Sequence, residues 1–292
     1  MRGVANIFII GFDIIGLFNK GKSMKISPIT LGFYAINNSS KKTSFGCEHC
    51  AQTMGIEDKL PRPEKYAECS SWMIPYEKRD ALKNEYKSKI LEAVTTPDGK
   101  LDKRIVDFLD NQKFEIEDVK TGQKSLKTIK EAIDSAIVRT YDVDTSAFHA
   151  TFTREIGEQI IKNGFDPSKI SRTKLGPGFY FSGSEGGAIE YSSCILMADF
   201  KGNCAQVTGP FYEKIIDANP GYKLASFIGL KSNDYDLGMA ESEVCTKLIN
   251  EYARDYLVND IGVDMAYGSS GRFETCYAVY NPDVISNTRF RN

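Results

Sequence analysis

Hydrophobic and charged positions recur with helical spacing over the first half of the chain. Residues 77–94 and 126–141 are rich in helix-forming residues with charges along their faces, and a Thr-Thr-Pro-Asp-Gly-Lys stretch at 95–100 interrupts that pattern. We therefore predict a mostly helical N-terminal region over residues 1–144, with a targeting or substrate-binding role.

Near residue 145 the pattern changes to short apolar and aromatic runs, which are typical of strands. One amphipathic stretch at 239–257 interrupts them, with Val244, Leu248, Tyr252 and Tyr256 on a single helical stripe. The strand-like runs cover 147–152, 178–183, 194–200, 205–209, 264–268 and 275–282. Residues 145–292 are thus predicted to form a mixed domain, and the fold class is α+β.

Composition narrows the class of protein. The 292 residues are 41% hydrophobic and carry a formal net charge of −2, which indicates a globular chain with no general attraction to nucleic acid or a membrane. Seven scattered cysteines lack the dense spacing of a small secreted scaffold, so we expect mostly thiols and a reducing compartment at the place of action. The expected location is cytoplasmic, or the cytosol of a host or target cell if the protein is an exported effector.

An apolar segment at 4–18 is broken by Asp13 and is too short to span a bilayer as a helix. It lacks a convincing small-residue cleavage site, so we expect local structure or an unfolded extension rather than a signal peptide. Met24 is an alternative start.

The segment around His149 contains one of only two histidines in the chain. Alternation places His149 and Thr151 on one face of a strand, opposite the apolar residues Phe148, Ala150 and Phe152. A helix with Ile156 and Ile160 on one face is predicted to follow and to end at Asn163-Gly164.

Downstream, the sequence Leu-Gly-Pro-Gly-Phe-Tyr-Phe begins at residue 175 and leads to Tyr191 on an expected helix. Gly176 and Gly178 allow the backbone to approach a ligand closely. Tyr180 and Tyr191 offer two rings that can stack on a flat ligand from opposite sides. For each tyrosine alone, an ordinary place in the core is an equally good interpretation.

Together these motifs resemble the ADP-ribosyltransferases of the diphtheria-toxin and poly(ADP-ribose) polymerase type, in their order and spacing. The resemblance covers residues 147 to about 286 and rests on these elements: His149-Ala150-Thr151, the helix end at Gly164, the Gly-Pro-Gly-Phe-Tyr-Phe run, Tyr191, and the late segment Glu-Thr-Cys-Tyr-Ala-Val-Tyr at 274–280. It implies a split β-sheet core with flanking helices and NAD as a substrate.

The resemblance also implies roles for single residues. His149 would bond the adenine-side ribose of NAD, the backbone at Ala150 would pair with the nicotinamide amide, and Thr151 would lie close to the ligand. Tyr180 and Tyr191 would enclose the nicotinamide ring. Gly178 belongs to the same cofactor-binding set, and no metal site is expected in it.

The position of the acid departs from the family's pattern. A carboxylate should stabilise the positive charge that develops on the ribose as nicotinamide leaves. Cys276 aligns with the family's glutamate, but Glu274 lies two residues earlier on the same face, so a bulge or shift of register would bring it into the site. We predict His149, Tyr180 and Glu274 as the catalytic set. Ala150 and Ala188 also depart from the family, which has glycine and serine there.

If Glu274 is a solvated turn residue, the acid must come from elsewhere, and Glu185, Glu190 and Glu243 are the alternatives. In either case the resemblance favours mono-ADP-ribosylation over polymer formation. The resulting hypothesis is a transferase acting on a protein, as a toxin or effector. The alternatives are an inactive NAD-binding or protein-interaction module and, with less support, a relative of the RNA 2′-phosphotransferases.

Other motifs favour plainer interpretations. Cys47, His49, Cys50 and Cys69 contain one Cys-x-x-Cys pair and lack a second, so unligated thiols are expected rather than zinc. The Gly-Ser-Ser-Gly-Arg run at 268–272 is expected to be a hairpin turn. Residues 217–238 are predicted to form a loop that faces the target protein. The oligomeric state is not readable from the sequence.

Overall fold

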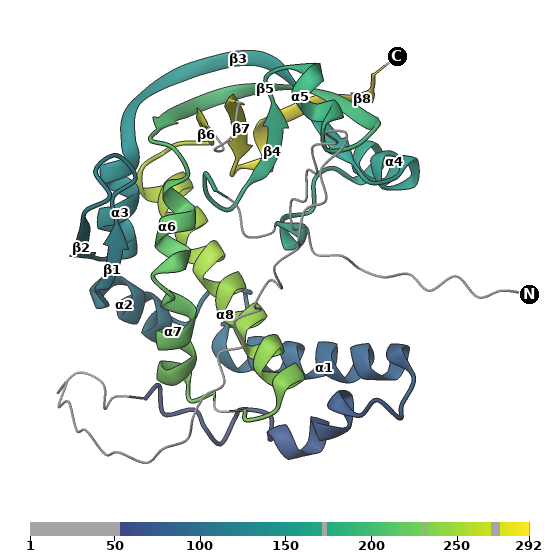
Figure 1. Ribbon diagram of the computed structural model, residues 1–292, viewed down its shortest axis with the longest axis vertical. Helices are drawn as coiled ribbons and strands as arrows, with labels where there is room; N and C mark the ends of the chain where they lie inside the picture. Colours follow the sequence, from purple (N-terminus) through teal and green to yellow (C-terminus); the bar gives the residue numbers. More distant parts are fainter. Residues whose placement is uncertain (1–52, 171–173, 231, 270–274, 292) are drawn as a thin grey trace, which may run out of the picture. The chain divides into compact units, whose positions relative to one another are not determined.

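Helices account for most of the described chain before residue 137 and recur between strands after it (Figure 1). The computed structural model describes residues 53–170, 174–230, 232–269 and 275–291. Its α-helices are α1 (Tyr76–Val94), α2 (Lys103–Asn111), α3 (Ile129–Ala136), α4 (Arg154–Asn163), α5 (Glu185–Ile189), α6 (Phe211–Asp217), α7 (Pro220–Ile228) and α8 (Tyr235–Asp255). The 3₁₀-helical segments are η1 (Pro63–Ser70), η2 (Pro167–Lys169) and η4 (Pro282–Val284), and η3 (Tyr256–Asp260) is π-helical.

Polar side chains determine where several helices begin. The Thr128 hydroxyl accepts a hydrogen bond from the Glu131 amide, and the Glu131 carboxylate accepts one from the Thr128 amide, which forms a capping box at the start of α3. Asp234 accepts from a backbone amide in the first turn of α8. The helices predicted at 77–94 and 239–257 are confirmed as α1 and α8.

The described strands form a two-stranded sheet and a six-stranded sheet. In the described chain they are β1 (Phe114–Glu117), β2 (Lys124–Lys127), β3 (Ile137–Thr151), β4 (Phe179–Ser182), β5 (Cys194–Val207), β6 (Met265–Ser269), β7 (Thr275–Val279) and β8 (Ile285–Phe290). β1 and β2 pair with each other, and the remaining strands follow the order β3-β4-β7-β6-β5-β8. Because β3 also pairs with β5, the strands β3, β4, β7, β6 and β5 close into a ring. In Figure 1, β3 is the long arched strand along the top of this sheet. The fold class is therefore α+β, with a helical region and a sheet core.

The predicted helix over 126–141 is wrong at both ends. Its start belongs to β2, and from Ile137 onward the chain is β3, so only α3 between them is helical. The run Ile-Val-Arg-Thr-Tyr at 137–141 is rich in β-branched and aromatic side chains and pairs with β5 along its length. Tertiary strand pairing thus prevails over the helical charge pattern.

The loop predicted at 217–238 is also wrong. Most of that segment is α7 and the first turn of α8, and Leu224 and Ile228 of α7 are fully buried. The apolar spacing of those side chains anchors α7 against the core, so the segment is a packed helix.

Two clusters of buried side chains hold these elements together. In the larger one, Ile90 of α1, Ile133 of α3 and Leu248 of α8 pack with Ala266 and Tyr280 from the sheet strands and their ends. The smaller one lies within the sheet and includes the rings of Phe165, Phe179, Phe181 and Phe200. The described residues fall in one compact unit, Cys47–Asn292. The boundary predicted between 144 and 145 lies inside β3, and the division of roles between the two regions stays a prediction.

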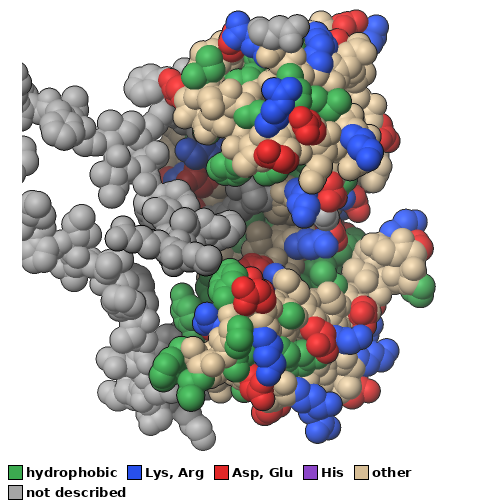
Figure 2. Space-filling view, turned by 90° about the vertical axis from the view of Figure 1, so that its right-hand side faces the viewer, with side chains coloured by type: hydrophobic (Ala, Val, Ile, Leu, Met, Phe, Trp, Pro, Cys, Tyr) green, Lys and Arg blue, Asp and Glu red, His purple; other side chains and the backbone are tan. Residues whose placement is uncertain are grey.

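The surface carries mixed charge. On the face shown in Figure 2, lysine and arginine side chains are interspersed with aspartate and glutamate rather than gathered in one patch. Among the helices of the described chain, none is long and apolar enough to cross a membrane. The apolar segment at 4–18 lies outside the described residues, so its interpretation stays a prediction.

Candidate functional site

His149 lies near the end of β3, where β3 meets β4. Its Nδ1 atom is 2.8 Å from the backbone oxygen of Tyr180 on β4. Since a carbonyl oxygen can only accept, Nδ1 carries the proton and Nε2 of the neutral ring is an acceptor. Burial lowers the pKa of His149 below its ordinary value, and the bond to the Tyr180 carbonyl opposes that change. The ring packs edge-on against Phe165, with ring centroids 5.2 Å apart, and is tilted against Phe181 at 5.3 Å.

Beside His149 lies a cavity of about 340 Å³. It is formed by the end of β3, by β4, by α5 with the turn after it, and by β7. Its lining residues are Phe148, His149, Ala150, Thr151, Phe152, Tyr180, Phe181, Ser182, Ala188, Tyr191, Ser192 and Cys276. The described lining is mainly apolar and aromatic and contains no Asp, Glu, Lys or Arg.

Strand register explains why distant residues meet here. Phe148 of β3 lies opposite Ser182 of β4, and Ser182 lies opposite Cys276 of β7. Thr151, close before α4, lies opposite Cys194, which follows the turn after α5, so both stretches share one end of the sheet. The predicted helix closing at Gly164 is confirmed as α4, with Gly164 in a positive-φ conformation at its end.

The two tyrosines differ in their exposure to solvent. The Tyr180 hydroxyl accepts a hydrogen bond from the Leu175 amide at 2.6 Å and donates one to the Gly176 carbonyl at 3.2 Å. Tyr180 therefore offers the cavity its ring, because its hydroxyl is engaged by the loop before β4. Tyr191 follows α5 in a turn instead of lying on a helix as predicted, and it is 71% exposed.

Thr151 and the two alanines complete the inner wall. Thr151 is almost fully buried, and its hydroxyl donates to the Thr153 carbonyl at 3.0 Å, immediately before α4. Ala188 of α5 is buried against the cavity. Ala150 lies between His149 and Thr151 on the same lining and adds a methyl group that glycine would lack, whereas Ala188 lacks the hydroxyl that serine would offer a ligand.

Close packing leaves no room for a Cβ atom at Gly176 or Gly178. A Cβ atom on Gly176 would lie 2.9 Å from the ring and hydroxyl of Tyr280, and one on Gly178 would lie 2.7 Å from the Val279 carbonyl oxygen. Neither glycine lines the cavity. The assignment of Gly178 to cofactor binding stays a prediction, since its close neighbour here is β7.

Glu274, the predicted acid, lies outside the described residues. Cys276, two positions later, is buried on β7 and lines the cavity. Of the alternative acids, Glu185 contacts the Arg291 guanidinium, and Glu243 pairs with Lys87 of α1 at 3.0 Å.

The third alternative, Glu190, is an exposed residue directly before Tyr191. Glu185, Glu190 and Glu243 are all absent from the described lining.

Phe152, Ser182 and Ser192 line the cavity but were not identified from the sequence. Alternation placed Phe152 on a strand face with Phe148 and Ala150, whereas Phe152 follows the end of β3 and its side chain is 90% exposed. β3 ends at Thr151, so the period of two no longer applies one residue later. Its position directly after the His149 motif is a sequence signal that could have identified Phe152 as a residue of the cavity.

The cysteine and histidine motif near the N-terminus contributes little to the described structure. Cys47, His49, Cys50 and the Gly-Ser-Ser-Gly-Arg turn, apart from its first two residues, lie outside the described residues. Cys69 is buried in η1, and burial raises the pKa of its thiol. Within the described ranges, His, Cys, Asp and Glu side chains form no group of three or more that could hold a metal ion.

Comparison with known proteins identifies no family. No protein-family model matches the sequence, and no curated protein matches it either. A solved structure that does match is the M. tuberculosis MbcT–MbcA toxin–antitoxin complex, with 11% identity over 56% of this chain and 88% of that chain, at a TM-score of 0.23. A score this low does not establish a shared fold.

Proposed function

We propose that this chain is an NAD-dependent mono-ADP-ribosyltransferase that modifies a protein. One observation carries the proposal: His149, Ala150, Thr151, Tyr180 and Tyr191 come from three separate segments and line the same cavity. The sequence resemblance requires these residues at one site.

The volume and the aromatic lining of the cavity are suited to the nicotinamide end of NAD. A volume of about 340 Å³ is within the usual range for small-molecule sites, and aromatic walls suit a flat ring such as nicotinamide. In the proposed complex, Nε2 of His149 accepts a hydrogen bond from a ribose hydroxyl. The rings of Tyr180 and Tyr191 flank the nicotinamide, and the Ala150 backbone pairs with its amide.

The reaction breaks the bond between ribose and nicotinamide and forms a new bond from the same ribose carbon to a nucleophile on the acceptor protein. Glu274 is proposed as the carboxylate that balances the positive charge developing on the ribose. The apolar walls exclude water and strengthen that interaction.

The second candidate function is an NAD-binding or protein-interaction module without turnover. The observation that favours it is the described lining, which contains no carboxylate. The same lining lacks lysine and arginine, which weakens the case for an RNA substrate.

Release of nicotinamide from NAD and transfer of label to proteins in a lysate test the proposal. Wild-type protein should do both, and His149→Ala and Glu274→Gln should each lower turnover at least about a hundredfold. Glu243→Gln is the matched control, since Glu243 is an exposed residue paired with Lys87. NAD binding without turnover in any lysate would favour the binding module, and full activity of Glu274→Gln would reject Glu274 as the acid.

A further inference from the structure

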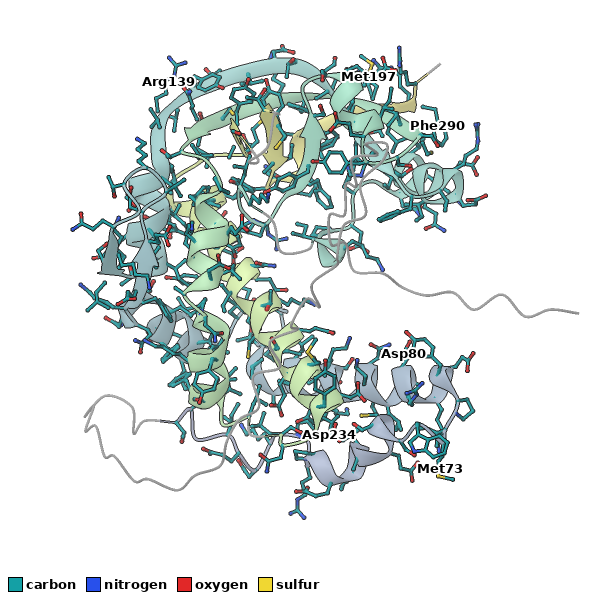
Figure 3. All side chains as sticks on the ribbon, viewed as in Figure 1. Met73, Asp80, Arg139, Met197, Asp234 and Phe290 are labelled. Atoms are coloured by element: carbon teal, nitrogen blue, oxygen red, sulfur yellow. The ribbon has the colours of Figure 1, made fainter. Side chains whose placement is uncertain are left out.

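A hollow of about 560 Å³ lies between α7 and the first turns of α8, away from the His149 cavity. Its lining residues are Asn219, Gly221, Tyr222, Ala225, Ser226, Leu230, Ser232, Asn233, Gly238, Glu241 and Ser242. The volume is within the usual range for small-molecule sites. In Figure 3 the labelled Asp234 marks the start of α8, where this hollow lies.

Glu241 on α8 is the charged group in this lining. Its side chain is buried, with the residue only 6% exposed. The carboxylate accepts hydrogen bonds from the Tyr86 hydroxyl at 2.6 Å and from the Ser232 amide at 3.2 Å. Burial raises the pKa of the Glu241 carboxyl, and these hydrogen bonds oppose the change.

In the described chain, no lysine or arginine forms an ion pair with Glu241. A buried carboxylate is costly unless it is paired, because it loses its hydration. Tyr86 and Ser232 supply hydrogen bonds and no opposite charge. Among the described residues nothing positive balances Glu241, so the site favours a positively charged ligand.

The remaining polar groups of the hollow suit the same kind of ligand. Asn219, Asn233, Ser226 and Ser242 supply amide and hydroxyl oxygens that can accept hydrogen bonds, and the lining formed by described residues contains no lysine or arginine. A second hollow of about 520 Å³ shares Glu241 and is also lined by Glu57, Glu64 and the basic group of Arg62. The described lining of the hollow between α7 and α8 has Glu241 as its charged group, so a cation there would meet no arginine of that lining.

We propose that the hollow between α7 and α8 binds a small organic cation with primary ammonium groups, and that Glu241 is its counter-charge. This proposal is independent of the function proposed for the His149 cavity. Ammonium nitrogens donate to the serine and asparagine oxygens while their charge compensates the buried carboxylate.

Calorimetric titration of the full chain with putrescine, and with butanediol as a neutral analogue, tests the proposal. Wild-type protein should bind putrescine and should not bind butanediol. Glu241→Gln keeps an acceptor for the Tyr86 hydroxyl and should weaken putrescine binding at least tenfold. Glu243→Gln, an exposed carboxylate two residues along the same helix, should bind as wild type does.

A second variant locates the ligand. Ser226→Phe, at an exposed position of α7, fills the hollow without changing any charge and should also weaken binding at least tenfold. Circular dichroism and thermal unfolding of each variant establish that it is folded. Failure of wild type to bind putrescine, equal binding of butanediol, or undiminished binding by folded Glu241→Gln or Ser226→Phe would overturn the proposal.

Discussion

A single hydrogen bond determines which nitrogen of His149 is available to a ligand. The Tyr180 carbonyl engages Nδ1, so Nε2 is the acceptor, and burial keeps the ring neutral at ordinary pH. The same contact ties the histidine to β4. Ligand binding and local order at the meeting point of β3 and β4 therefore depend on one side chain.

If the chain binds NAD as proposed, the lowered pKa of His149 determines how that binding depends on pH. Affinity should be constant between about pH 6.5 and 8 and should fall only at lower pH, where Nε2 gains a proton and stops accepting. Calorimetric dissociation constants measured across this range check the prediction. A wild-type affinity that already falls between pH 7.5 and 6.5 would contradict it, and His149→Gln should show weak binding without this dependence.

The stability of the fold should respond to the same group. The pKa of His149 is lowered on folding, so the unfolded chain binds more protons between the folded value and about 6.5. The contribution of neutral His149 is complete above pH 6.5 and is lost as pH falls through the folded pKa. Denaturant unfolding should therefore show a shallower loss of stability on acidification for His149→Gln than for wild type.

Gly178 illustrates how a motif glycine can serve packing. Gly178→Ala places a methyl group against the Val279 carbonyl and the Tyr280 ring, and should cost about 1–3 kcal/mol of unfolding free energy. Gly186→Ala is the control, because nothing lies within 4 Å of the added Cβ and Gly186 is within α5. That change should be neutral or stabilise by up to about 1 kcal/mol. Urea unfolding of both variants measures the difference, and equal stabilities would refute this explanation.

At the scale of elements, Lys130 of α3 joins three helical segments. Its Nζ atom is 2.8 Å from Asp110 of α2 and 3.6 Å from Asp260 of η3. The same atom lies 5.6 Å from the ring centre of Tyr252 and 4.9 Å from that of Tyr256. Ion pairs and cation–π contacts thus act together where α2, α3 and the end of α8 meet.

Lys130→Met should lower the unfolding free energy by about 1–2 kcal/mol, because it removes a half-buried pair and two ring contacts. Lys201→Met is the comparison, since its pair with Asp144 is 81% and 76% exposed and should matter by less than about 0.5 kcal/mol. Thermal unfolding of both proteins tests the contrast. Equal effects would mean that the contacts of Lys130 are no stronger than those of an exposed pair.

At the scale of the whole molecule, the larger core does not stop at the start of the sheet. Ile90 and Ile133 from the helical region pack in the same cluster as Leu248 of α8 and Tyr280 after β7. Removing residues 1–144 would expose Leu248 and Tyr280 and cut β3 in two. The apolar contacts that hold α8 in place would be lost on one side.

A fragment of residues 145–292 should therefore fail to unfold cooperatively, whereas a fragment of 47–292 should show one transition, as expected for a compact unit. Circular dichroism during heating and limited proteolysis measure this. A folded 145–292 fragment with full NAD binding would show that the sheet is stable alone and would support the predicted boundary.

What the sequence determined by itself was local. Helix-forming residues with regularly spaced charges predicted α1, and the spacing of apolar residues predicted α4 and α8. Both kinds of signal depend on residues within a few positions of each other. The expectation that His149 and Tyr180 belong to one site came from a resemblance, because spacing alone says nothing about residues that far apart.

Tertiary structure decided the rest. Pairing with β5 made 137–141 a strand, and the register of β3, β4 and β7 brought Phe148, Ser182 and Cys276 to one end of the sheet. Tyr280 packs so closely against Gly176 that a side chain at position 176 would clash with it. Each of these outcomes depends on which distant segments pair, and that choice is made by the free energy of the assembled core rather than by neighbouring residues in the chain.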